Sequence, residues 1–166
     1  MVHIDPHATD LGTSATVAAN IIAVIGGVSI GGRIIMGSGS DRIGSKSSCI
    51  IAFIMMASAL LWLQIAKEVW MLYLFAAIFG FAYGGLAAIF PPLVAELFGL
   101  SSLGVIMGII AFAGSIGGAI GPVLAGKMFD LSGSYGLVFL VCAAISTIGF
   151  ISTAILTPTG REGGEK

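Results

Sequence analysis

Charged residues are scarce in this sequence, and their scarcity excludes most classes of soluble protein. Asp, Glu, Lys and Arg together make up 9% of the 166 residues, whereas a typical soluble domain has about 25%. With so few charges, the chain cannot cover a folded domain with a solvated surface. The formal net charge of −1 also provides no basic field that would attract nucleic acid.

Reactive and metal-binding groups are equally sparse. Cys49 and Cys142 each lie in an apolar segment and lack the spacing of metal ligands, which predicts two buried free thiols and no metal site. No nucleophile stands in an evident pairing with a base. We therefore expect neither an enzyme nor a bound cofactor.

Hydrophobic residues make up 57% of the chain, and the mean hydropathy is +1.09. A helix needs about 20 mostly apolar residues to span a bilayer, and five segments meet that need. The connections between them are short, so consecutive helices are expected to be antiparallel. The sequence thus predicts an all-α polytopic membrane protein with five transmembrane helices, at about residues 16–36, 48–65, 69–97 (continuing past Pro91-Pro92), 103–128 and 135–157.

The basic residues predict an orientation. With five spans, one side of the membrane holds five basic residues and the other holds two, Lys67 and Lys127. The richer side is expected to be cytoplasmic, which places residues 1–15 outside and the tail, residues 158–166, inside. The chain would then begin outside the membrane and cross it an odd number of times, with no signal segment before the first helix. This combination suggests a fragment that lacks upstream helices. The five basic residues on the inner side are Arg33, Arg42, Lys46, Arg161 and Lys166.

Residues 37–46 (GSGSDRIGSK) form the connection between the first two segments. Gly39 and Gly44 permit a turn that a side chain would block. Asp41 can accept hydrogen bonds from the exposed N–H groups at the N-terminus of a neighbouring helix.

Two cations complete this connection. Arg42 and Lys46 can pair with acidic side chains or with lipid phosphates, and Glu96 is the expected ion-pair partner. An ordinary cytoplasmic loop that is rich in basic residues is the alternative interpretation.

Most of the 25 glycines lie inside the predicted helices. Small residues let membrane helices approach closely, because there is little hydrophobic force between helices in lipid. Gly80 and Gly84 have the GxxxG spacing. The fourth segment carries a longer series, in which we single out Gly108, Gly117, Gly121, Pro122 and Gly126.

Arg33 is the one basic residue well inside an apolar segment. A snorkelling arginine that reaches the lipid headgroups is one interpretation. The other is a substrate contact, because a guanidinium can hold a carboxylate with two hydrogen bonds. Ser29 and Gly26 lie one and two turns earlier on the same helical face and would leave space above the guanidinium.

Other polar residues inside the predicted helices are weaker candidates. Tyr83 could donate a hydrogen bond to a substrate, although a tyrosine in this position more often packs against a neighbouring helix. Asn20 and Ser115 are similar. No interior Asp, Glu or His stands out as a proton relay, so a coupling proton is considered without an assigned carrier.

Two patterns resemble the major facilitator superfamily. Residues 37–46 are similar to the GxLsDRxGRK loop between its eighth and ninth helices. Residues 108–126 are similar to the pattern G-x8-G-x3-GP-x2-GG, with Ala125 in place of one glycine. More closely, HATDLG (7–12), GGRIIMGSGSDRIG (31–44), PPLVAELFGL (91–100) and GPVLAGKMFDLSGSYGLVF (121–139) resemble the oxalate/formate antiporter and monocarboxylate transporter branch.

The resemblance implies a position within that fold. The five segments would be helices eight to twelve, most of the C-terminal six-helix half, with the N-terminal half missing. It also implies that Arg33 contacts a substrate carboxylate. The second basic residue that oxalate transporters carry in the eleventh helix has no counterpart here, which favours monocarboxylates over dianions.

The resulting functional expectation is a secondary transporter of small organic anions that works by alternating access. It would lie in a plasma membrane or a bacterial inner membrane, with residues 37–46 acting as a gating loop. Two alternatives stay open: a truncated, non-transporting membrane product, and a transporter of the same superfamily for an unrelated small solute. A membrane enzyme has little support.

Overall fold

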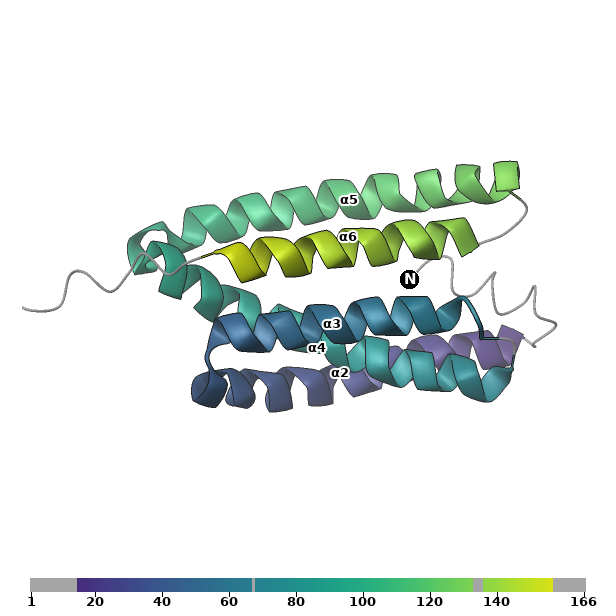
Figure 1. The fold of residues 1–166 in the computed structure, drawn as a ribbon, viewed down its shortest axis with the longest axis horizontal. Helices are drawn as coiled ribbons and strands as arrows, with labels where there is room; N and C mark the ends of the chain where they lie inside the picture. The colour runs from purple at the N-terminus through teal and green to yellow at the C-terminus, as the bar shows by residue number, and fades with distance from the viewer. Residues whose placement is uncertain (1–14, 67, 133–135, 157–166) are drawn as a thin grey trace, which may run out of the picture.

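Five long helices and one short 3₁₀ turn make up the part of the chain that the computed structural model describes, residues 15–66, 68–132 and 136–156 (Figure 1). All five helices are long and apolar enough to cross a membrane, which confirms the predicted all-α class. Most of the external segment predicted for residues 1–15, and the predicted tail, residues 158–166, lie outside the described residues. The elements are α2 (Ala15–Ile43), α3 (Ser45–Leu63), α4 (Val69–Phe98), η1 (Leu100–Ser102), α5 (Leu103–Ser132) and α6 (Gly136–Ile155).

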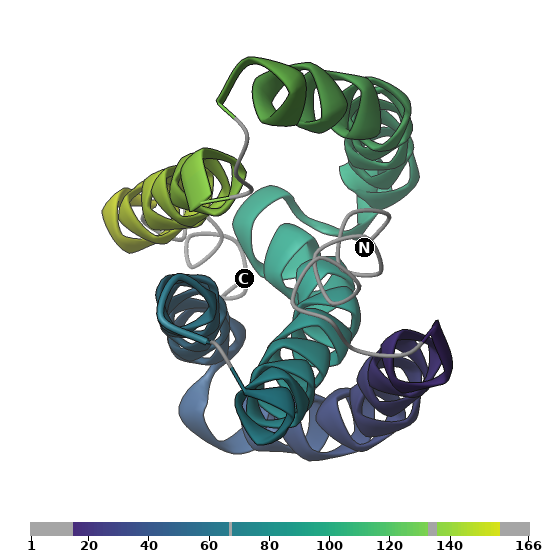
Figure 2. The same ribbon diagram turned by 90° about the vertical axis from the view of Figure 1, so that its right-hand side faces the viewer.

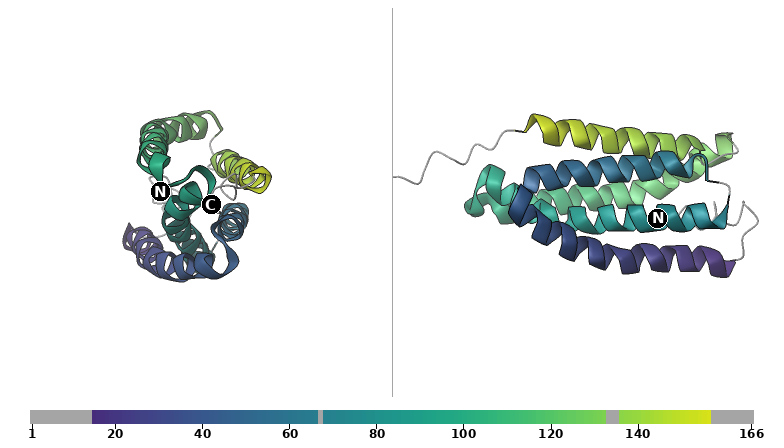
Figure 3. Two further views of the ribbon diagram at one scale, coloured as in Figure 1. Left: turned by 90° about the vertical axis from the view of Figure 1, so that its left-hand side faces the viewer. Right: turned by 60° about the horizontal axis from the view of Figure 1, so that its bottom comes forward.

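The helices run alternately in opposite directions, because the connections between them are short. Helices α2, α4 and α6 therefore finish at the same end of the bundle, where α3 and α5 begin (Figure 1 and Figure 3). We call the end formed by Ile43, Ser45, Phe98 and Ile155 the connection end, and the opposite end the far end.

Helix α2 extends seven residues beyond the end predicted at residue 36. The GSGS run that suggested a loop is helical, because its hydroxyls bond back to the preceding turn. Ser38 donates to the carbonyl oxygen of Ile34 (2.7 Å), and Ser40 donates to that of Gly37 (2.6 Å). Hydroxyls bonded in this way are compatible with a continuing helix.

The predicted turn is therefore confined to Gly44, where φ is 88°. Glycine adopts this conformation without the steric penalty that a side chain would impose. Gly39, the other glycine expected in the turn, lies inside α2.

The most extensive helix contact joins α2 and α4, which are parallel and not consecutive in the chain. A β-carbon at Gly80 would lie 2.6 Å from the carbonyl oxygen of Ile25, and one at Gly84 would collide with the backbone of Ser29. The GxxxG spacing of α4 thus gives direct contact between two backbones, as the sequence predicted.

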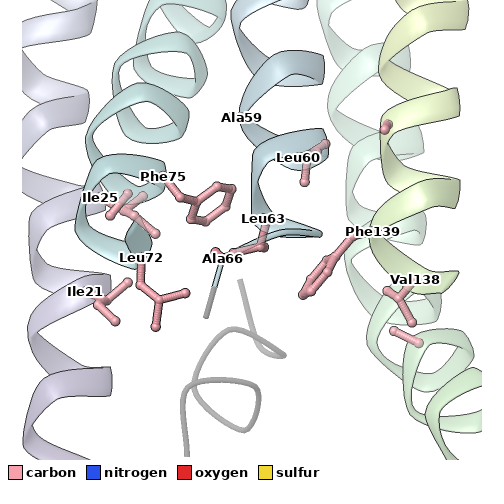
Figure 4. Close-up of a cluster of buried hydrophobic side chains, with 13 residues drawn as sticks. Ile21, Ile25, Ala59, Leu60, Leu63, Ala66, Leu72, Phe75, Val138 and Phe139 are labelled. Atoms are coloured by element: carbon pink, nitrogen blue, oxygen red, sulfur yellow. The ribbon is translucent and has the colours of Figure 1, made fainter. Parts of the chain in front are cut away.

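Apolar side chains are buried in two clusters. The larger lies toward the far end and joins α2, α3, α4 and α6, with Ala125 from α5 (Figure 4). The smaller lies toward the connection end between α3 and α4 and includes Cys49, Leu86 and Ile89. The larger cluster includes Ile21, Ile25, Leu60, Leu63, Leu72, Phe75, Val138 and Phe139.

Helix α5 takes little part in this packing. In the end-on view α4 is central, and α5 stands apart from α2 and α3 at the opposite edge of the bundle (Figure 2). None of the residues in the most apolar stretch of α5 is buried, whereas half of those in the corresponding stretch of α4 are. Helix α5 therefore presents an apolar surface that the other described helices do not cover.

Candidate functional site

Arg33 projects from an apolar helix and is exposed. Its neighbours Ile30 and Ile34 are 61% and 67% exposed, so this stretch of α2 faces away from the core. Since α2 continues to Ile43, Arg33 lies ten residues, or about 15 Å, from the helix end. The sequence predicts a helix end at residue 36, so Arg33 lies further from the end of the helix than predicted.

The two small residues expected to clear space above Arg33 lie in different surroundings. A side chain at Gly26 would meet no atom of another helix within 4 Å. Ser29 is buried, its backbone contacts α4 at Gly84, and its hydroxyl donates to the carbonyl oxygen of Gly26 (2.7 Å). Gly26 therefore leaves open space, whereas Ser29 belongs to the helix contact.

Tyr83 lies in α4 and is 48% exposed. Its ring stacks on Phe79 with 6.2 Å between ring centroids, and Phe79 stacks in turn on Phe75 at 5.2 Å. Tyr83 borders an apolar cavity of about 610 Å³, which is lined by residues of α3, α4, α5 and α6, including Gly117, Gly121 and Ser146.

Arg33 and Tyr83 face the same side of the α2–α4 pair. The residues in contact are Ile25, Ser29, Gly32 and Met36 of α2 and Gly80, Phe81, Gly84 and Gly85 of α4. Because the two helices are parallel, a side chain rotated clockwise from these contacts on one helix points to the same side as a side chain rotated counter-clockwise on the other. At 100° per residue, Arg33 is rotated about 70° from the mean direction of the α2 contact residues, and Tyr83 is rotated about 130° in the opposite sense from that of the α4 contact residues. Arg33 and Tyr83 thus border one open face, which Ser29 does not reach.

At the connection end, two polar contacts tie the start of α3 to other helices. The hydroxyl of Ser45 donates to Oε1 of Glu96 in α4 (2.6 Å). The ammonium group of Lys46 donates to the carbonyl oxygen of Leu156, just after α6 (2.5 Å). A carboxylate at a helix N-terminus and a cation at a helix C-terminus both match the helix dipoles.

These contacts differ from the expected gating loop. Asp41 was expected to accept hydrogen bonds at the N-terminus of a neighbouring helix, but the carboxylate that the structure places there is that of Glu96. Glu96 was expected to pair with Arg42 or Lys46, and its contact is the hydroxyl of Ser45 instead. Asp41 and Arg42 are exposed in the last turn of α2. Antiparallel α3 and α4 bring residues 45 and 96 together, which sequence spacing alone does not reveal.

Substitution of Gly44 by alanine is expected to cost about 1–3 kcal/mol of folding stability, because φ of 88° with ψ of 145° is a region for glycine. The matched control is Gly39→Ala, inside α2, where a side chain would meet no atom of another helix and alanine favours the helix by up to about 1 kcal/mol. The melting temperatures of the two purified variants measure the difference in stability. Equal melting temperatures would contradict the conformational role of Gly44.

Three of the glycines singled out in α5 do not pack against another described helix. A side chain at Gly108, Gly117 or Gly121 would meet no atom of another helix within 4 Å. Gly117, Gly121 and Pro122 line the cavity instead, and Gly126 is partly exposed. A packing role for Gly108, Gly117 and Gly121 therefore requires a surface beyond the described helices.

Comparison with known proteins relates these features to a family. The model of the Major Facilitator Superfamily matches residues 2–166. The chain is 28% identical over 145 residues to human monocarboxylate transporter 12, an alignment that covers 85% of this chain and 28% of that protein. It is 29% identical over 161 residues to human monocarboxylate transporter 7, covering 95% and 31%. It is 28% identical over 156 residues to the MFS transporter asaE of Aspergillus flavus, covering 90% and 35%.

The chain thus spans about a third of the length of the curated relatives that it matches. The match to the superfamily model covers nearly all of it, and its five long apolar helices agree with a membrane transporter. The chain is therefore an integral membrane protein that belongs to the major facilitator superfamily of transporters.

Proposed function

We propose that this chain is part of a transporter that moves small organic anions, monocarboxylates in particular, by alternating access. The observation that carries the proposal is Arg33, an exposed cation deep in an apolar helix, on the open face that Tyr83 also borders. A guanidinium can bind a carboxylate with two hydrogen bonds, and the phenol of Tyr83 can donate a third. Similarity to proteins named as monocarboxylate transporters supports the choice of substrate.

The charge at this face favours a monoanion. Among the described residues of α5, Lys127 is the basic one, and it lies near the far end of the helix. Arg33 can pair with one carboxylate of a dianion, and the other carboxylate would stay unpaired. An unpaired charge costs more free energy where the site is partly desolvated. We propose helices eight to twelve as the place of α2 to α6, with Asp41, Arg42, Gly44, Lys46 and Glu96 forming a gate on the cytoplasmic side.

Uptake into proteoliposomes containing the transporter of which this chain is part tests the proposal. The substrates are radiolabelled lactate, the dianion oxalate and the neutral solute glycerol. We expect saturable uptake of lactate, less uptake of oxalate, and little uptake of glycerol. Uptake of glycerol alone would contradict the carboxylate assignment and favour a superfamily transporter for an unrelated solute.

A truncated, non-transporting product is the alternative. The genomic sequence upstream of Met1 distinguishes the two. An in-frame coding sequence for further apolar helices supports the transporter, whereas a stop codon supports the truncated product.

Tyr83→Phe is expected to raise KM for the carboxylate about 5- to 10-fold with little change in the maximal rate, because one hydrogen bond contributes about 1 kcal/mol. Tyr73→Phe is the matched control, ten residues earlier in α4 and partly buried with the larger cluster. The concentration dependence of uptake gives both constants. An unchanged KM for Tyr83→Phe would remove Tyr83 from the site.

A further inference from the structure

The face of α2 that carries Arg33 is closed on one side of this residue and open on the other. Residues seven positions apart lie nearly in line along a helix, because seven steps of about 100° fall about 20° short of two turns. Ser40, seven residues after Arg33, is buried. Gly26, seven residues before Arg33, is exposed, and a side chain there would meet no atom of another helix within 4 Å. Among the described residues, the open space beside Arg33 therefore lies toward the far end.

Helix α4 closes this face toward the connection end. A β-carbon at Gly37, one turn after Arg33, would lie 3.6 Å from the β-carbon of Ala88 in α4, which is ordinary van der Waals contact. The hydroxyl of Ser40 donates to the carbonyl oxygen of Gly37 (2.6 Å) and is thus satisfied within α2. A molecule bound at Arg33 has room to extend toward the far end and little room in the opposite direction.

The guanidinium of Arg33 is expected to lie on the side of Gly26. Long side chains in a helix lean toward its N-terminus and cover the preceding turn, and the N-terminus of α2 is at the far end. The guanidinium would then cover the turn that contains Ile30, about one turn, or about 5.4 Å, from Gly26. A carboxylate that pairs with the guanidinium through two parallel hydrogen bonds would direct its organic group at Gly26.

Gly26 leaves a gap in a row of apolar side chains. Ile22 and Ile30 lie one turn before and one turn after it in α2, and both are exposed. Glycine places no side chain between them, so the gap has the size of the missing side chain. Its borders are hydrocarbon, which favours an apolar group over a charged or hydrogen-bonding one. We call the space beside Gly26, between Ile22 and Ile30, the Gly26 gap.

We infer that the Gly26 gap receives the organic group of the substrate, and that the preferred substrates are monocarboxylates with an apolar chain of about six carbons. Carbon–carbon bonds are about 1.5 Å long, so the two carbons that lactate carries beyond its carboxylate cannot cross one helical turn of about 5.4 Å. The further carbons of hexanoate can cross it. This inference rests on the proposed function, in which Arg33 binds the carboxylate, and adds that Gly26 sets the chain length of the substrate.

Competition for lactate uptake tests the inference. Proteoliposomes that contain the transporter of which this chain is part receive radiolabelled lactate, with the same buffered pH on both sides, and increasing concentrations of propionate or hexanoate. The two acids carry the same charge and differ only in the length of the chain. Burial of one methylene group changes affinity about fourfold. We therefore expect the half-inhibitory concentration of hexanoate to be at least about tenfold lower than that of propionate.

Substitutions at Gly26 test whether the Gly26 gap causes this preference. Gly26→Leu fills the gap with its own side chain and is expected to reduce the preference for hexanoate to less than about twofold. Gly27→Leu is the matched control, because it adds the same side chain about 100° further around α2, where a side chain also meets no atom of another helix within 4 Å. The preference should stay near tenfold in this control.

Gly26→Ala keeps the test decisive if Gly26→Leu does not reach the membrane. It narrows the Gly26 gap by one methyl group and is expected to lower the preference for hexanoate about two- to fourfold. Equal half-inhibitory concentrations of the two acids in the unmodified transporter, or an undiminished preference in the Gly26 variants, would overturn the inference. A failure of the proposed function gives a different result, since lactate uptake would not saturate and neither acid would inhibit it in the unmodified transporter or in any variant. That result would remove the inference as well, because no carboxylate would be bound at Arg33.

Discussion

Replacing Arg33 by alanine is expected to lower carboxylate uptake by about two to three orders of magnitude. Loss of one partner of a desolvated, hydrogen-bonded charge pair costs about 2–5 kcal/mol, and each 1.4 kcal/mol corresponds to about a tenfold change in affinity. Arg33 is exposed, and a side chain at Gly26, two turns earlier, would meet no atom of another helix within 4 Å. A truncated side chain should therefore leave the fold intact while removing the anion contact.

Arg33→Lys is the more discriminating variant. Lysine keeps the positive charge but cannot form the two parallel hydrogen bonds of a guanidinium with a carboxylate. We expect this variant also to lose most of its uptake. If Arg33 instead reaches the lipid headgroups, either cation would serve and Arg33→Lys would transport normally.

The matched control is Lys127→Ala, which removes an exposed cation near the far end of α5. Its uptake is expected to stay near that of the unmodified transporter. Protein amount in the membrane is measured by immunoblot for each variant, so that a defect in transport is separated from a defect in folding. Normal uptake by Arg33→Ala at normal expression would refute the carboxylate contact.

The helices could be predicted from the sequence because hydropathy is a local property. Each apolar run is long enough to span a bilayer, and the structure contains a helix for each of them. The end of α2 could not be predicted in this way. Gly and Ser residues suggest a loop, but the hydroxyls of Ser38 and Ser40 find acceptors in the preceding turn, and the helix continues to Ile43.

The contacts of the site residues depend on tertiary geometry, which residue spacing does not contain. Ser29 lies one turn before Arg33, so both were expected on one open face. The packing of Gly84 against the backbone of Ser29 instead takes this serine out of that face. Likewise, Glu96 reaches the start of α3 only because α3 and α4 are antiparallel.

Glycine patterns likewise do not reveal which helix packs against them. The GxxxG spacing of Gly80 and Gly84 and the longer series in α5 both predict close packing. Only the first is realised among the described residues, since α2 lies against α4 and no described helix lies against Gly108. The pattern indicates that a helix can be approached closely, and the partner has to come from the structure.

Enlarging Gly84 is expected to give the largest loss of stability in the chain. A side chain there would collide with the backbone of Ser29, which cannot move aside as a flexible side chain can. Gly84→Ala is expected to cost about 1–3 kcal/mol through overpacking, offset in part by the gain in helix propensity of up to about 1 kcal/mol. Gly84→Leu would force α2 and α4 apart, and we expect it to cost about 3 kcal/mol or more.

Gly27 provides the matched control for both substitutions. It lies in α2 close to the same contact, but a side chain there would meet no atom of another helix within 4 Å. Gly27→Ala and Gly27→Leu change volume and helix propensity as the Gly84 variants do, without the collision. The melting temperature and the monodisperse fraction in detergent should be lower for Gly84→Ala than for the unmodified chain, and lower still for Gly84→Leu. Both Gly27 variants should stay near the unmodified chain. If Gly27→Leu and Gly84→Leu were equally damaging, the cost would come from leucine in these helices and not from the contact between the α2 and α4 backbones.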